Sequence, residues 1–154
     1  MTEAPRLTVG DLRLPSPVVL SRSASIRDAA EAMTYQRVSA VIVLGGIGTG
    51  ALLTEHDLVR SLALGCDAST PAASLATPSP LTVTPSTPVV EAVETMLRHG
   101  VRHLVVGEVG GRTLAVMSLR QSVAGLLSSI EVPGWLSALR LALHVEWHEG
   151  RPGV

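Results

Sequence analysis

The sequence repeats itself after 63 positions, and this repeat limits the fold more than any other feature. Aligning residues 17–49 with 80–112 gives eight identical pairs, and the order of structural signals recurs in both halves with a one-residue slip in a glycine-rich loop. The identical pairs are Pro17/Pro80, Ser23/Ser86, Ala29/Ala92, Glu31/Glu94, Met33/Met96, Val38/Val101, Val43/Val106 and Gly48/Gly111. A supersecondary unit that is used twice buries its apolar faces by packing the copies together. We therefore expect one module made of two similar halves.

Each half has the pattern strand, helix, strand, strand, helix. A β-branched stretch at 18–20 or 81–83 comes before an amphipathic helix with apolar residues at i, i+3, i+4 and i+7. These helical residues are Ile26, Ala29, Ala30 and Met33, then Val89, Ala92, Val93 and Met96. Residues 38–44 and 101–106 are apolar nearly throughout, as in strands covered on both faces, and third strands follow around 51–53 and 114–117. The sequence predicts a layered α+β fold of two βαββα repeats paired with pseudo-two-fold symmetry.

The composition shift between and after the repeats sets the expected boundaries. We place repeat one at 8–65, a connecting segment rich in Pro, Ser, Thr and Ala at 66–76, repeat two at 77–130 and a helical tail at 131–154. The tail has apolar residues at helical spacing, which predicts an amphipathic helix that packs on its own module, on a dimer mate or on a partner protein. Those residues are Trp135, Leu136, Leu139, Ala142, Leu143 and Trp147.

Charge and composition argue against several classes of partner. The formal net charge is -1, with 12 Lys plus Arg against 13 Asp plus Glu and no basic stripe, so we expect no nucleic-acid partner. A lone Cys66, the absence of a signal-like start and the lack of a long apolar run favour a cytoplasmic protein without a membrane anchor. With 2% aromatic residues, a ring-shaped ligand would lie between aliphatic side chains.

Four segments carry a resemblance to a known family. They are TEHDL at 54–58, RVSAVIV at 37–43, VRHLVV at 101–106 and SLRQSV at 118–123. Together with the repeat, they make residues 8–130 resemble a tandem CBS domain protein (cystathionine β-synthase domain pair, or Bateman module) of the small stand-alone bacterial type. The resemblance implies a regulatory protein that is not an enzyme, needs no cofactor and forms a homodimer that signals to an unknown protein partner. It also implies two clefts between the repeats for an adenosine ligand such as AMP, ADP, ATP or S-adenosylmethionine.

The first cleft implied by the resemblance is named here the Asp57 cleft. A carboxylate in this position can accept hydrogen bonds from both hydroxyls of a ribose, while the start of the helix faces a phosphate. Its expected residues are Thr54, His56 and Asp57 from repeat one and Thr77, Leu81, Val101 and Arg102 from repeat two.

The second implied cleft is named here the Gln121 cleft. Its expected residues are Ser118, Arg120 and Gln121 from repeat two and Leu14, Val18, Val38 and Ser39 from repeat one. Gln121 stands where the family has the ribose carboxylate and Leu14 where a Thr often contacts ligand, so the sequence favours the Asp57 cleft. Ala51 and Ala115 replace a usual Gly, and we expect their methyl groups to narrow the approach to both clefts.

Two other interpretations of these residues remain open. Thr54-x-x-Asp57 and Ser118-x-x-Gln121 also fit a capping box, in which the side chains satisfy the start of a helix instead of a ligand. A scaffold with empty clefts would then act through dimerisation and protein binding alone. A small hydrolase or metal enzyme built on His144 and His148 has only residue types in its favour, so we assign no catalytic and no metal-ligating residue.

Overall fold

The computed structural model describes residues 6–45, 50–108, 111–129 and 134 of the chain. Repeat one contains the 3-10 turn η1 (Val9–Asp11), β1 (Val19–Leu20), α1 (Ile26–Gln36), β2 (Ala40–Val43), β3 (Ala51–Thr54) and α2 (Glu55–Ala63). The connecting segment contains the 3-10 turn η2 (Ala72–Ser74), and repeat two contains β4 (Thr82–Val83), α3 (Val89–His99), β5 (His103–Gly107), β6 (Thr113–Ser118) and α4 (Leu119–Ser129). The predicted α+β fold of two βαββα units is confirmed. The predicted tail helix lies outside the described residues.

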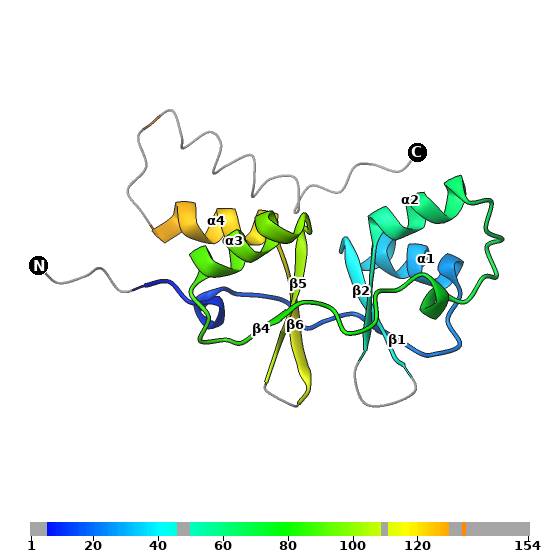
Figure 1. Ribbon diagram of the computed structural model, residues 1–154, viewed down its shortest axis with the longest axis horizontal. Helices are drawn as coiled ribbons and strands as arrows, with labels where there is room; N and C mark the ends of the chain where they lie inside the picture. Colours follow the sequence, from blue (N-terminus) through cyan, green and yellow to red (C-terminus); the bar gives the residue numbers. More distant parts are fainter. Residues whose placement is uncertain (1–5, 46–49, 109–110, 130–133, 135–154) are drawn as a thin grey trace, which may run out of the picture.

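Each repeat forms its own three-stranded sheet, with strand orders β1-β2-β3 and β4-β5-β6. In both sheets the first pair is parallel and the second pair antiparallel, and the register places Ala40 opposite Thr54 and His103 opposite Ser118. The two halves lie side by side, each with its helices next to its own sheet (Figure 1). The register therefore puts the start of β2 and β5 next to the residues that open α2 and α4.

Alternate residues of the central strand β2 pack against different parts of the molecule. Val41 and Val43 of β2 pack with α1 residues in a core on the helix side, while Ala40 and Ile42 pack in a separate cluster with Val105 of repeat two. All four residues of β2 are buried. The continuous apolar run in the sequence is thus explained, because one face of the strand meets helices and the other meets the partner repeat.

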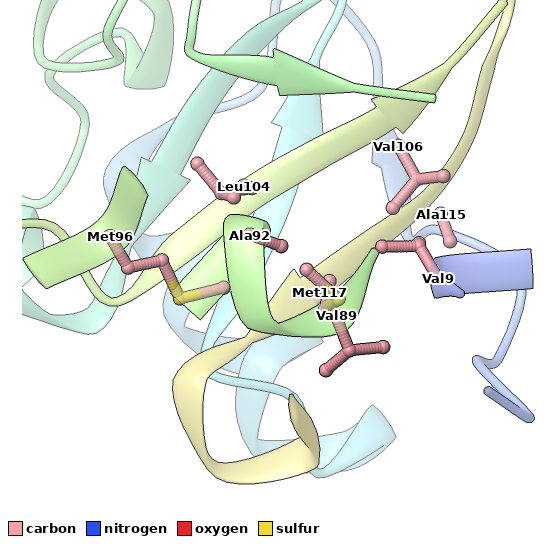
Figure 2. Close-up of a cluster of buried hydrophobic side chains, with 8 residues drawn as sticks. All are labelled: Val9, Val89, Ala92, Met96, Leu104, Val106, Ala115 and Met117. Atoms are coloured by element: carbon pink, nitrogen blue, oxygen red, sulfur yellow. The ribbon is translucent and has the colours of Figure 1, made fainter. Parts of the chain in front are cut away.

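A short 3-10 turn precedes the first strand of each repeat, η1 before β1 and η2 before β4, and each turn packs on the repeat to which that strand does not belong. Val9 of η1 is 1% exposed and lies in the repeat-two core among residues of α3, β5 and β6, as Figure 2 shows. Its backbone N–H donates to the Thr87 carbonyl at 2.8 Å. In the reverse direction Ala72 of η2 is buried in the repeat-one core, and its N–H donates to the Ala24 carbonyl at 2.9 Å. Burying a valine side chain stabilises a fold by roughly 1.5–3 kcal/mol, so this exchange ties the repeats together.

Within residues 6–45, 50–108 and 111–129, no helix combines the length and apolar character needed to span a membrane.

Candidate ligand-binding clefts

The helices that open the two clefts start in the same way. The Asp57 carboxylate accepts hydrogen bonds from Thr54 N–H and Thr54 Oγ1, both at 2.9 Å. In repeat two the Gln121 Oε1 accepts from Ser118 N–H at 2.8 Å and from Ser118 Oγ at 2.9 Å. The capping interpretation therefore describes the contacts that both pairs make in this structure, and each pair satisfies an early backbone donor of its helix.

The second carboxylate oxygen of Asp57 has a different partner. Arg60, one turn further along α2, donates from Nη2 to Asp57 Oδ1 at 3.3 Å. The Asp57 side chain is 13% exposed and that of Arg60 is 53% exposed. The carboxylate therefore already accepts three hydrogen bonds of the about four that its two oxygens can accept, so a ribose that donated both of its hydroxyls to Asp57 would have to replace one of these donors.

A histidine from repeat two lies where the repeats meet. His103 Nε2 is 2.7 Å from Ser39 Oγ, which joins the start of β5 to the residue before β2. Ser39 is also tied to α2, because its carbonyl accepts from Glu55 N–H at 3.0 Å. Burial, with a smaller effect of the Arg102 charge, lowers the pKa of His103 to about 4, although the Asp57 carboxylate acts in the opposite direction. His103 is therefore neutral at pH 7.

A cavity of about 980 Å³ lies in the Gln121 cleft. Its walls come from both repeats: residues 11–18 and the segment from the end of α1 into β2 on one side, and parts of β5, β6 and α4 on the other. This volume is at the upper end of the range of about 300–1,000 Å³ for small-molecule sites. The cavity includes seven of the residues expected there from the resemblance: Leu14, Val18, Val38, Ser39, Ser118, Arg120 and Gln121.

The residues expected in the Asp57 cleft have different environments. His56 is exposed at the start of α2, whereas Val101 packs against the apolar core of repeat two. Thr77 forms an isolated β-bridge with Leu52, with its N–H donating to the Leu52 carbonyl at 2.8 Å. Leu81 and Arg102 are exposed. Neither Thr54 nor Asp57 lines the 980 Å³ cavity.

Several lining residues of the cavity were missed by the sequence reasoning. Arg13, Arg37, His103 and Ala124 line it, from the segment before β1, the end of α1, β5 and α4 respectively. Arg37 has a positive φ of 55° as the C-cap of α1, a conformation that Gly or Asn adopts more readily. A non-glycine residue at the predicted end of a helix is the one signal in the sequence that points to Arg37.

The two alanines that replace the family's glycine do not lie as expected. Ala51 packs against the helix-side core of repeat one, and Ala115 is 6% exposed within the helix-side core of repeat two. Their strand neighbours Leu52 and Val116 are the residues that join the cluster between the repeats. The expected narrowing is therefore wrong, because the two methyl groups lie on the sheet faces covered by helices.

A pair of βαββα repeats with a ligand-sized cavity between them defines a class of small-molecule-binding module. A family model described as CBS domain matches residues 9–64 and 72–121, and the chain belongs to this family.

Individual relatives support the same assignment. A solved CBS domain protein from Pyrobaculum aerophilum, complexed with AMP, is 27% identical with a TM-score of 0.68, over 88% of this chain and 99% of that one. The protein CBSX2, solved in complex with AMP, is 25% identical with a TM-score of 0.64, over 79% of this chain and 96% of that one. An uncharacterized 17.7 kDa protein of Acidianus ambivalens is 27% identical over 71% of this chain, which spans 66% of that relative.

Proposed function

We propose that this chain is a regulatory module that binds an adenosine-containing ligand between its repeats. The cavity of about 980 Å³ in the Gln121 cleft is the observation that carries the proposal, because its walls belong to different repeats. The AMP complexes of two relatives with the same fold support an adenosine ligand. AMP, ADP, ATP and S-adenosylmethionine are the candidates.

The chemistry of the cavity suits a nucleotide. Aliphatic side chains of Val18, Val38 and Val116 provide apolar walls for a base. Arg120 at the start of α4 lines the same cavity and carries a guanidinium group of the kind that binds phosphate. The Asp57 cleft stays a second candidate, since its carboxylate can accept ribose hydroxyls once Arg60 or Thr54 is displaced.

Ligand binding would act on the relation between the repeats. A ligand that contacts both walls of the cavity binds best to the arrangement of the two repeats in which both walls reach it. Binding therefore shifts the population toward that arrangement. No covalent step is part of this function.

A homodimer is the proposed means of passing the change on to a protein partner. Exposed apolar side chains on α2 and α3, which a second copy could cover, support this part. They are Val59 at 62%, Leu62 at 76%, Val90 at 53% and Leu97 at 66% exposure.

Thermal unfolding with each candidate nucleotide tests the proposal. A ligand at 100 times its dissociation constant stabilises the native state by about 2.7 kcal/mol, which raises the melting temperature of a chain of this size by several degrees. Asp57→Ala should leave this shift in place if the Gln121 cleft holds the ligand, and abolish it if the Asp57 cleft does. A melting temperature that stays constant with every nucleotide at millimolar concentration would refute adenosine binding.

A ligand-free scaffold is the alternative function. It is favoured by one observation, the three hydrogen bonds that the Asp57 carboxylate already accepts from its own helix start. Under this alternative the dimer and its protein partner persist, while nucleotides change neither the melting temperature nor the dimer. Sedimentation with and without AMP, next to the unfolding experiment, separates the two functions.

A further inference from the structure

Two arginines of repeat one lie on the wall of the 980 Å³ cavity. Arg13 comes from the segment before β1 and Arg37 from the end of α1. Both residues are exposed, and among the described residues neither guanidinium group makes a hydrogen bond or an ion pair. Arg120 on the opposite wall already has an interaction of its own. The donors of Arg13 and Arg37 are therefore available to a ligand of this cavity.

The backbone of Arg37 supports a role for its side chain in the cavity. Arg37 is the C-cap of α1 and has the left-handed conformation, with φ 55° and ψ 45°. The equivalent residue of repeat two, 63 positions later, is Gly100 with φ 64°. Glycine adopts this conformation without strain, whereas an arginine adopts it at a cost in free energy. Repeat one thus has an arginine where the backbone favours glycine, and this arginine lines the cavity.

The equivalent positions of repeat two carry no charge. Ala76 corresponds to Arg13 and is buried in the core of repeat one, and Gly100 corresponds to Arg37. The 63-residue shift that relates the repeats therefore relates two arginines to two uncharged residues. The pair of guanidinium groups is a feature of one cavity wall and is not a consequence of the duplicated fold.

The charges on the repeat-one wall favour an anion. Asp11 is the one carboxylate among the described residues that line the cavity, and its Oδ2 accepts from Thr8 N–H and Thr8 Oγ1, both at 2.8 Å. The two guanidinium groups thus outnumber a carboxylate that is already hydrogen-bonded. Guanidinium groups bind phosphate oxygens through paired, charge-assisted hydrogen bonds. S-adenosylmethionine instead carries a sulfonium and an ammonium group against a single carboxylate, so its net charge is positive.

We propose that Arg13 and Arg37 make the Gln121 cleft selective for adenosine compounds that carry a phosphate, over adenosine itself and over S-adenosylmethionine. This inference rests on the proposed adenosine-binding function and names the ligand class of the same cavity. Arg13 and Arg37 are its specificity-determining residues.

Calorimetric titration with AMP, adenosine and S-adenosylmethionine tests the selectivity. Adenosine is the matched ligand, because it differs from AMP only in the phosphate. We expect the wild type to bind AMP at least about tenfold more tightly than either of the other two compounds. The double variant Arg13→Gln/Arg37→Gly should bind AMP at least about tenfold more weakly and adenosine as the wild type does, so that the ratio of the two affinities falls by the same factor.

The single variants separate a loss in the cavity from a loss of the fold. Arg37→Gly relieves the left-handed backbone, so it should lose AMP affinity while its melting temperature stays at or above that of the wild type. Arg98→Gln removes the same charge from the exposed surface of α3, outside the cavity lining, and should leave the ratio of AMP to adenosine affinity unchanged. An equal fall of this ratio in Arg98→Gln would indicate a general effect of net charge and would overturn the inference.

The outcomes also separate this inference from the function on which it rests. If adenosine or S-adenosylmethionine binds as tightly as AMP, or if the double variant leaves the ratio of AMP to adenosine affinity unchanged, the selectivity is overturned and adenosine binding stands. If none of the three compounds binds at millimolar concentration, both fall.

Discussion

The Asp57 and Gln121 clefts share a helix start and differ one turn later. The Thr54–Asp57 and Ser118–Gln121 pairs make the same capping bonds at 2.8–2.9 Å. After the one-residue slip, Arg60 of α2 corresponds to Ala124 of α4. Arg60 reaches back to the Asp57 carboxylate, whereas Ala124 lines the 980 Å³ cavity.

The residues before and at the start of the central strands, next to these helices, also differ in size between the repeats. Ser39 and Ala40 stand before and at the start of β2, while the corresponding residues of repeat two are the larger Arg102 and His103. Ser39 and Ala40 both line the cavity in the Gln121 cleft, and His103 lines it as well, next to Ser39. The comparison teaches that duplication kept the contacts that satisfy the backbone of each helix start, while the side chains beside them changed in size and charge.

The largest effect should come from filling the open cleft. Ala124→Trp adds a large ring to the α4 face that lines the cavity; the ring takes up only part of the volume, but it obstructs a ligand that lies against α4. We expect at least a 100-fold loss of affinity for the ligand of this cleft, equivalent to about 2.7 kcal/mol, measured by calorimetric titration.

The control for this variant is Ala124→Ser, which changes the volume little and should bind as the wild type does. A wild-type affinity in Ala124→Trp, with the fold intact by circular dichroism, would place the ligand outside the Gln121 cleft. The difference between the clefts would then have no bearing on binding.

The second prediction concerns His103. Its counterpart in repeat one is Ala40, which has no titratable group. Burial lowers the pKa of His103 to about 4. The charge of Arg102 acts in the same direction with a smaller effect, and the Asp57 carboxylate acts against both. The unfolded chain binds a proton at His103 below about pH 6.5 and the native state only below about 4, so native stability is lost as the pH falls between these values. We expect His103 to contribute about 2–3 kcal/mol to the loss between pH 7 and pH 4.

Chemical denaturation at both pH values, for the wild type and for His103→Gln, measures this contribution. The glutamine can hydrogen-bond to Ser39 but does not titrate. Between pH 7 and pH 4, the stability of the variant should therefore fall by about 2–3 kcal/mol less than that of the wild type. Nearby Thr or Ser residues donate hydrogen bonds that lower the pKa of three exposed carboxylates, Asp11, Asp28 and Asp67, and their loss of stabilisation in acid is common to both proteins. Equal losses in the two proteins would contradict the buried position of His103.

The fold could be predicted from the sequence because its signals are local. The periodicity of Ala29 and Met33, and of Ala92 and Met96, defined the buried faces of α1 and α3, and these four residues are all at most 5% exposed. What the repeat alignment could not reveal was that Val9 packs in the core of the other repeat. That exchange depends on the path of the chain between halves, on which local periodicity carries no information.

The candidate site was predicted less completely, and for a physical reason. Similarity to a family identifies positions such as Asp57, but it does not include the volume of the side chains around them. Arg60 and Ala124 are ordinary helix residues in the sequence, and their effect appears only when α2 and α4 are compared in three dimensions. The sequence therefore favoured the cleft with the family's carboxylate, whereas the cavity described here lies in the one with Gln121.

The smallest expected effect comes from freeing Asp57. Arg60→Ala removes a partly exposed ion pair, which contributes only about 0.2–1 kcal/mol to stability, and leaves the Oδ1 acceptor open to a ribose hydroxyl. In an Ala124→Trp background, where the Gln121 cleft is obstructed, we expect adenosine to bind up to about fivefold more tightly than with Arg60 present, as measured by calorimetric titration. Arg60→Lys serves as the control, since it keeps the positive charge next to Asp57. If adenosine binds equally in all three proteins, Arg60 does not limit this cleft, and the difference between the two clefts lies in other residues.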